Sequence, residues 1–271
     1  MSLVVRTWNL FHGNCHPPER RAHVEAAVRL ASEDEPAILC LQEVPGWALA
    51  EVGSWSGMRA CADLAARPAF GPFPWTAGLG KLVTSLHPGR LRSAFAGQGN
   101  AILLREDMRV LGRELLTLNS RRFRRAQARW LRLPPIARLA WAKERRICQT
   151  VRIALPDGRT ALVANLHATA YGPDDRLADA ELLRAAVFAD GIAEPDDIVV
   201  LAGDFNVRPS RSRTLADLSS PEWGFSKPGP GIDHLLVRGA SSSSHRVWPA
   251  ESRRLGGCLV SDHAPVEVVV E

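Results

Sequence analysis

Short apolar runs rich in valine, isoleucine and leucine recur along the chain, and they have the composition of buried β-strands. Three longer segments place apolar residues at helical spacing instead, and these predict helices over residues 18–34, 47–66 and 173–192. The runs that predict strands are LVVRTWNLF (3–11), AILCLQEV (37–44), GNAILLR (99–105), RICQTVRIAL (146–155), TALVANLHA (160–168), DIVVLAGDFN (197–206), GIDHLLVRG (231–239) and APVEVVVE (264–271).

The order of these elements predicts mixed sheets. Several neighbouring strands follow one another without a helix between them, and Pro156-Asp157-Gly158 has the residues of a hairpin turn. A purely parallel sheet needs a crossover between its strands, so we expect mixed sheets covered by helices. No repeat or linker divides the chain, and we expect one domain over residues 1–271.

Composition limits the possible classes of protein. Hydrophobic residues make up 46% and charged residues 23% of 271 residues, as in ordinary globular proteins. No apolar stretch has the roughly 18 residues of a membrane span, and the first residues lack the pattern of a signal peptide, so we expect a cytoplasmic protein. The five cysteines are scattered without a C-x-x-C pair, which predicts reduced, mostly buried thiols and neither a disulfide framework nor a zinc site.

The net charge of +5 comes from one segment. Residues 105–146 hold 13 arginines or lysines against 4 acidic residues, whereas acidic residues are in excess elsewhere. Such a surplus indicates a polyanionic partner, which could be nucleic acid or an anionic membrane surface. The alternative is a charged face that is simply solvated. No feature of the sequence predicts a protein partner.

Polar residues of a restricted kind stand where the predicted strands end. One such residue is explained by turn chemistry, but turn chemistry does not explain carboxylates, carboxamides and imidazoles at the ends of six strands. Carboxylate oxygens suit Mg²⁺ or Mn²⁺, a histidine beside an aspartate suits a general base, and amide and imidazole donors suit an oxyanion. The residues concerned are Asn9, Glu43, Asn165 with His167, Asp204 with Asn206, Asp233, and Asp262 with His263.

The motifs W-N, L-Q-E, G-N-A-I-L, N-L-H, G-D-F-N, a late aspartate and S-D-H occur in this order between residues 4 and 269, and the chain thereby resembles the endonuclease/exonuclease/phosphatase superfamily. The resemblance implies a four-layer α/β/β/α sandwich, in which two mixed β-sheets pack face to face with helices outside. It implies a phosphoesterase that uses Mg²⁺ or Mn²⁺ to direct water at phosphorus. His167 and Leu10-Phe11 make the chain more similar to DNase I-like or sphingomyelinase-like enzymes than to abasic-site repair enzymes.

The resemblance also implies metal and base residues by position. Glu43 would bind the metal with help from Asn9, and Asp262 would support the metal side. His263 would act as the general base, and Asp233 would orient its imidazole.

The remaining motif positions imply phosphate-handling roles. Asp204 would orient or deprotonate the attacking water, and Asn206 would hold the phosphoryl oxygens. His167 would stabilise the transition state or protonate the leaving oxygen. Arg146 is the candidate for a contact with the substrate phosphate, with Arg145 as its alternative. The other histidines receive no role: His12, His16, His23, His87, His234 and His245.

A basic insertion stands at about residues 119–146, where the family usually has a short connection. It predicts two short helices broken at Pro134-Pro135, because proline cannot continue a helix. Its arginines and tryptophans suit a nucleic-acid backbone, an anionic membrane, or a lid packed on the domain. We expect a phosphodiesterase with nucleic acid as the favoured substrate, followed by a phospholipid, then a small or inositol phosphate, with a non-catalytic binding module last.

Overall fold

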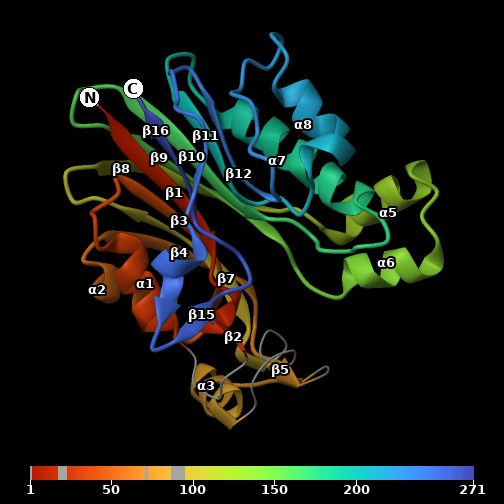
Figure 1. Cartoon of the computed structure of the whole chain (residues 1–271). Helices are drawn as coiled ribbons and strands as arrows, with labels where there is room; N and C mark the ends of the chain where they lie inside the picture. Colours follow the sequence, from red (N-terminus) through yellow and green to blue (C-terminus); the bar gives the residue numbers. More distant parts are fainter. Residues whose placement is uncertain (1, 18–22, 71–72, 87–94) are drawn as a thin grey trace. The chain divides into compact units, whose positions relative to one another are not determined.

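The computed structural model describes residues 2–17, 23–70, 73–86 and 95–271. The first residues of the helix predicted over 18–34, and His87, lie outside this part. The chain forms two compact units (Figure 1), and each contains one large mixed sheet. Residues 2–106 and 246–269 form the six-stranded unit, and residues 107–245 with 270–271 form the five-stranded unit.

The six-stranded unit is built on a sheet of order β13-β16-β1-β3-β7-β4, in which β1 and β3 run parallel and β7 is antiparallel to β3 and β4. The strands of this sheet are β1 (Leu3–Asn9), β3 (Ile38–Pro45), β4 (Arg59–Ala66), β7 (Gln98–Leu104), β13 (Arg246–Val247) and β16 (Val266–Val270). Short strands β2 (Cys15–His16), β14 (Arg254–Leu255) and β15 (Cys258–Val260) form a second sheet, and β5 (Ala69–Phe70) pairs with β6 (Phe73–Pro74). Its helices are η1 (Phe11–Gly13), α1 (Val24–Ser32), α2 (Val52–Ser56), α3 (Ala77–Leu86) and η3 (Ala250–Arg253).

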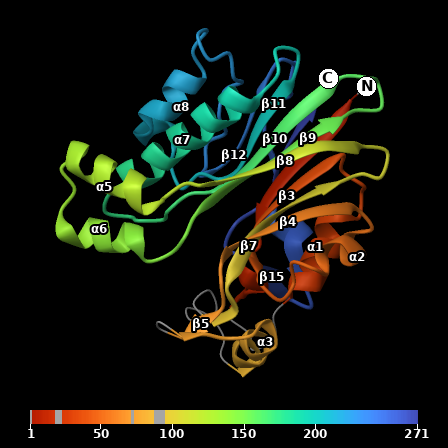
Figure 2. The same cartoon turned by 180° about the vertical axis from the view of Figure 1, so that it is seen from behind.

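The five-stranded unit has the order β12-β11-β10-β9-β8, and only its β10–β11 pair is parallel. Helix α7 covers one face, where its apolar side packs on alternate residues of β10 and β11 (Figure 2). Its strands are β8 (Arg109–Thr117), β9 (Ile147–Ala154), β10 (Thr160–His167), β11 (Ile198–Asp204) and β12 (Asp233–Arg238). Its helices are α5 (Arg121–Trp130), α6 (Pro135–Ala142), α7 (Arg176–Ile192), η2 (Pro209–Arg211) and α8 (Arg213–Leu218).

Most of the predicted elements are confirmed, including the hairpin turn at residues 156–158 between β9 and β10. The break at the paired prolines is also confirmed, since α5 ends at Trp130 and α6 begins at Pro135. In the part of the chain that the structure describes, no helix combines the length and the apolar character needed to cross a bilayer.

The helix predicted over residues 47–66 is wrong in its second half. Helix α2 ends at Ser56, because Gly57 caps it with a φ of +67°, and the alanine-rich residues 59–66 form β4. Pairing with β7 along the strand outweighs the helical preference of alanine. Strand β8 was not predicted, because most of its side chains are exposed and give no apolar alternation.

Strands β10 and β11 approach very closely at Gly203. Its φ is +138°, and a Cβ built there would lie 1.9 Å from the Leu166 carbonyl oxygen. Only glycine avoids both the unusual backbone conformation and this overlap. Gly203 thus fixes the pairing immediately before Asp204.

Substitution Gly203→Ala is expected to lower the free energy of unfolding by about 3 kcal/mol, because it adds an overlap to a strained backbone conformation. Urea denaturation measures the change. Gly172→Ala is the matched control, since a Cβ there meets no atom within 4 Å. Equal stability of the two variants would contradict the close approach.

A buried ion pair stabilises the six-stranded unit. Arg6 is fully buried, and it donates to Glu267 at 2.9 and 2.6 Å and to Asp34 at 2.7 Å. Burial alone would raise the pKa of Glu267, but hydrogen bonds from Trp248 and Arg6 and the charge of Arg6 outweigh it and leave the pKa below its ordinary 4.5. The hydrogen bond from Arg6 likewise lowers the pKa of Asp34.

A carboxyl with a lowered pKa stabilises the folded state above its unfolded pKa, and this contribution is lost as the pH falls through the folded value. We therefore expect the stability of the wild type to decline below pH 4.5. Glu267→Gln should flatten this part of the profile and cost about 3 kcal/mol at neutral pH, because Arg6 loses its buried counter-charge. Urea midpoints measured across acidic pH test this, with the exposed Glu25→Gln as control.

Candidate functional site

At one edge of the five-stranded sheet, β10 and β11 end and β12 begins with predicted site residues that lie in register. His167 of β10 is paired with Asp204 of β11, and Asp204 is paired with Asp233 of β12. Residues directly opposite one another on paired strands share a face of the sheet. Because Leu166 and Leu201 pack under α7, alternation places His167, Asp204 and Asp233 on the other face.

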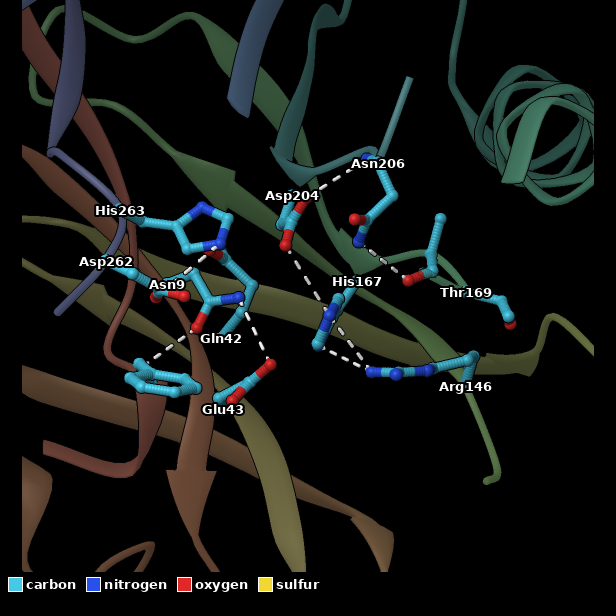
Figure 3. Close-up of polar contacts among 12 residues, drawn as sticks. Asn9, Gln42, Glu43, Arg146, His167, Thr169, Asp204, Asn206, Asp262 and His263 are labelled. Atoms are coloured by element: carbon cyan, nitrogen blue, oxygen red, sulfur yellow. Dashed lines mark hydrogen bonds and ion pairs between the residues drawn. The ribbon is translucent and has the colours of Figure 1, made fainter. Parts of the chain in front are cut away.

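His167 lies between the carboxylate of Asp204 and the guanidinium of Arg146 (Figure 3). Its Nε2 is 3.5 Å from Oδ2 of Asp204, and Nη1 of Arg146 lies 2.8 and 3.0 Å from its two ring nitrogens. Arg146 is itself almost buried, and Glu144 binds its other terminal nitrogen at 3.1 Å. The permanently charged guanidinium is therefore held against the imidazole, which makes this pair a donor group for an anionic oxygen.

A tight turn follows β11 and orients Asp204 and Asn206. The backbone N–H of Asn206 donates to Oδ1 of Asp204 at 3.0 Å, and the Asn206 side-chain amide donates to the carbonyl of Ala168 at 3.0 Å. Among the described residues, the second hydrogen of that amide has no acceptor, and it could bind a ligand. Asp204 is 1% exposed, so these contacts keep the carboxylate in one orientation.

A buried carboxylate, Glu181 of α7, supports the chain just after His167. Both the N–H and the hydroxyl of Thr169 donate to it, at 2.7 and 2.8 Å, and the indole N–H of Trp141 in α6 donates at 2.5 Å. Burial raises the pKa of Glu181, although these hydrogen bonds oppose the shift. Glu181 thus joins the basic insertion to the segment that Asn206 contacts.

In the six-stranded unit, a β-bulge directs Glu43 out of the core. Leu41 and Val44 are both buried in the same apolar cluster, and the register of β3 against β7 shifts between them. In a regular strand, a single residue separates two successive residues that point into the core. Here two residues, Gln42 and Glu43, separate the inward-pointing Leu41 and Val44. Glu43 has a φ of +50°, and its side chain remains 18% exposed.

Two neighbours hold the Glu43 carboxylate. Nδ2 of Asn9 lies 3.4 Å from Oε1, and Nε2 of His12 lies 3.3 Å from Oε2. The Asn9 side-chain oxygen accepts the N–H of Phe11 at 2.9 Å, which fixes the amide with its nitrogen toward Glu43. Asn9 therefore orients the carboxylate in this structure. A carboxylate that is positioned in this way and still reachable fits a hard divalent cation.

The S-D-H segment is fastened to β1 through its backbone. The Ser261 hydroxyl donates to the carbonyl of Asn9 at 2.7 Å and accepts the N–H of His263 at 3.0 Å. The indole N–H of Trp8 donates to the carbonyl of His263 at 3.0 Å, as does Arg253. The imidazole stays partly exposed, with Asp262 at 3.9 Å.

Backbone strain is concentrated beside these residues. Seven described residues other than glycine have a positive φ, and five of them stand at, or within three residues of, predicted site positions. Such conformations cost energy and persist where the surroundings enforce them, often at functional sites. The five residues are Phe11, His12, Glu43, Asn206 and Ser261.

The predicted site residues thus form two groups. One lies in the five-stranded unit and contains His167, Asp204, Asn206, Asp233 and Arg146, and the other lies in the six-stranded unit and contains Asn9, Glu43, Asp262 and His263. Convergence of the two groups on one metal ion stays a prediction.

Sequence reasoning missed two residues near these groups. His12 received no role, yet it lies against Glu43; its only signal was its place three residues after Asn9. Glu181 gave no signal because it reads as a surface position of an amphipathic helix. His234, by contrast, is fully buried with Nε2 2.9 Å from the Val207 carbonyl, as expected of a structural histidine.

The sequence matches the Endonuclease/Exonuclease/phosphatase family over residues 7–263. A search of curated proteins gave no match.

Similar solved structures include the endonuclease/exonuclease/phosphatase from Bacteroides vulgatus (TM-score 0.67, 13% identity, 100% of this chain and 99% of that one) and that from Beutenbergia cavernae (0.65, 15%, 100% and 71%). Another is TDP2 from Caenorhabditis elegans (0.61, 16%, 100% and 74%). At these identities the likeness shows the fold, and it confirms the predicted class, an α/β sandwich with two mixed sheets. From the family match over nearly its whole length, the chain belongs to the endonuclease/exonuclease/phosphatase family of phosphoesterases.

Proposed function

We propose that this protein hydrolyses a phosphodiester by water attack with the help of Mg²⁺ or Mn²⁺, and that nucleic acid is its substrate. The in-register group His167, Asp204 and Asp233 carries this proposal, because it places two carboxylates and an imidazole at adjacent strand ends. We also propose that both units act as one domain, since the family match spans both. The proposed location of the enzyme is the cytoplasm.

In the proposed reaction, Asp204 orients or deprotonates the attacking water, and the remaining amide hydrogen of Asn206 binds a phosphoryl oxygen. Both are immobilised by the turn after β11, so little reorganisation accompanies the reaction. His167, backed by Arg146, stabilises the negative charge on the phosphoryl oxygens in the transition state or protonates the leaving oxygen.

The residues of the six-stranded unit supply the metal and base roles. Glu43 would hold the divalent ion, with Asn9 orienting its carboxylate and Asp262 supporting the metal side. Such an ion polarises the phosphoryl oxygens and lowers the pKa of water. His263 is the proposed general base, with Asp233 orienting its imidazole, and Ser261 and Trp8 fix the backbone that carries it.

A phospholipid is the second candidate substrate. Trp130, Ile136 and Leu139 of the basic insertion are 78%, 64% and 68% exposed, and exposed apolar residues beside arginines are typical of membrane-binding segments. Hydrolysis rates on single- and double-stranded DNA, RNA and sphingomyelin vesicles distinguish the two candidates. Activity on sphingomyelin without activity on any polynucleotide would overturn the nuclease proposal.

His263→Ala is expected to lower kcat on an aryl phosphodiester by a factor of about 10² to 10⁴, the usual contribution of a general base. Asp204→Asn should have a comparable effect, because it removes the carboxylate beside the water. Reactions with added Mg²⁺ or Mn²⁺ and with a chelator measure both. His245→Gln is the control, since His245, whose Nε2 lies 2.8 Å from the Leu235 carbonyl, has no role in the proposed reaction. Unchanged kcat in His263→Ala would exclude the assigned role.

Glu43→Gln is expected to weaken Mn²⁺ binding by at least about tenfold, because loss of even a supporting residue has that effect at metal sites. Calorimetric titration of the folded protein measures this without reference to activity. Glu33→Gln, an exposed carboxyl at the end of α1, should bind as the wild type does. Identical affinities in all three proteins would contradict the assignment of Glu43.

A further inference from the structure

The two helices of the basic insertion enclose a recess lined almost entirely by arginine. Helices α5 and α6 lie side by side in the five-stranded unit in both views (Figures 1 and 2). Their facing sides surround a volume of about 620 Å³. The lining residues are Arg121, Arg124, Arg125, Ala128, Arg129, Arg138 and Trp141.

The two helices themselves supply no carboxylate to compensate this charge. Residues 121–143 contain no aspartate or glutamate. Arg124 and Arg138 each use one nitrogen for a backbone carbonyl, of Asn119 and Leu133 respectively, at 2.8 Å. In the described part of the chain, none of the five recess arginines forms an ion pair. Five neighbouring guanidinium groups repel one another, and a bound polyanion would relieve that repulsion.

The exposed apolar residues of the insertion point elsewhere. Ile136 and Leu139, three apart, share a side of α6 that differs from the side of Arg138 and Trp141. Trp130 is seven residues from Phe123 and so shares its side of α5, away from the arginines. In a membrane-binding helix, the basic and the apolar residues contact the same flat membrane surface. Arginines around a recess are instead placed to surround a polyanion.

We propose that this recess binds the phosphate backbone of single-stranded nucleic acid, as a binding site separate from the residues assigned to catalysis. The inference deepens the proposed nuclease function and rests on it for the identity of the polyanion. Guanidinium groups bind phosphate through paired N–H donors. A flexible single strand can bring successive phosphates to this small group of guanidiniums, as it does in the basic grooves of single-strand-binding proteins.

The recess is also connected to the proposed catalytic group. Trp141 forms part of its wall, and the indole N–H donates to Glu181, which in turn accepts both hydrogen bonds from Thr169. Thr169 follows Ala168, whose carbonyl holds the Asn206 amide. A strand bound in the recess is therefore held by the same rigid framework that positions Asn206.

The test measures binding apart from hydrolysis. Fluorescence anisotropy of a labelled oligothymidine, with chelator present, is recorded for full-length His263→Ala protein across a range of salt concentrations. In that background Arg125→Gln/Arg129→Gln removes two recess charges. Arg122→Gln/Arg132→Gln removes two exposed charges of the same insertion that do not line the recess.

We expect the recess variant to bind on the order of tenfold more weakly near 0.1 M salt, with a salt slope reduced by about 1.4, since each phosphate contact to a single strand contributes about 0.7. The control variant should bind as its parent does. Equal weakening in both variants would show a response to net charge alone and overturn the proposal, as would no weakening in either. Loss of binding to phosphatidylserine vesicles with unchanged oligothymidine binding would assign the recess to lipid. Absence of polynucleotide hydrolysis by the wild type with Mg²⁺ or Mn²⁺, alongside specific binding in the recess, would reject the nuclease function and leave the recess proposal intact.

Discussion

The close pairing of β10 with β11 is the constraint on which the predicted site residues of the five-stranded unit depend. A side chain at residue 203 would overlap the backbone of Leu166, so the two strands can remain in register to their ends only with glycine there. That register brings His167 opposite Asp204, and the next pairing adds Asp233. The catalytic assignment is therefore a consequence of backbone geometry before any side chain is considered.

In the six-stranded unit, the predicted site residues are positioned by strained backbone conformations, and not by a close approach of two strands. A bulge frees Glu43 from strand alternation, and unusual backbone conformations recur at His12 and Ser261. The first motif, W-N, and the last, S-D-H, are joined by hydrogen bonds between Ser261 and Asn9 and between Trp8 and His263. Trp8 and Ser261 thus hold the backbone in place beside Asn9 and His263, which carry the proposed chemical roles.

The sequence predicted these parts unevenly, for physical reasons. Strands buried on both faces, such as β10 and β11, and the polar residues at their ends were visible as abrupt changes in a local pattern. Strand β8 was invisible because its side chains are exposed, and β4 was mistaken for a helix because its pairing with β7 is not encoded locally. His12 and Glu181 escaped notice because their partners are distant along the chain or lie in another element.

The buried carboxylate of Glu181 ties the basic insertion to the interior of the five-stranded unit. One of its oxygens accepts both the Trp141 indole of α6 and the Thr169 hydroxyl, while the other accepts the Thr169 amide. Excision of α5 and α6 would leave this group short of a donor inside the apolar packing of α7, where a half-satisfied acid is costly. The insertion is consequently integrated into the interior of its unit, and its loss during evolution would require a compensating change at residue 181.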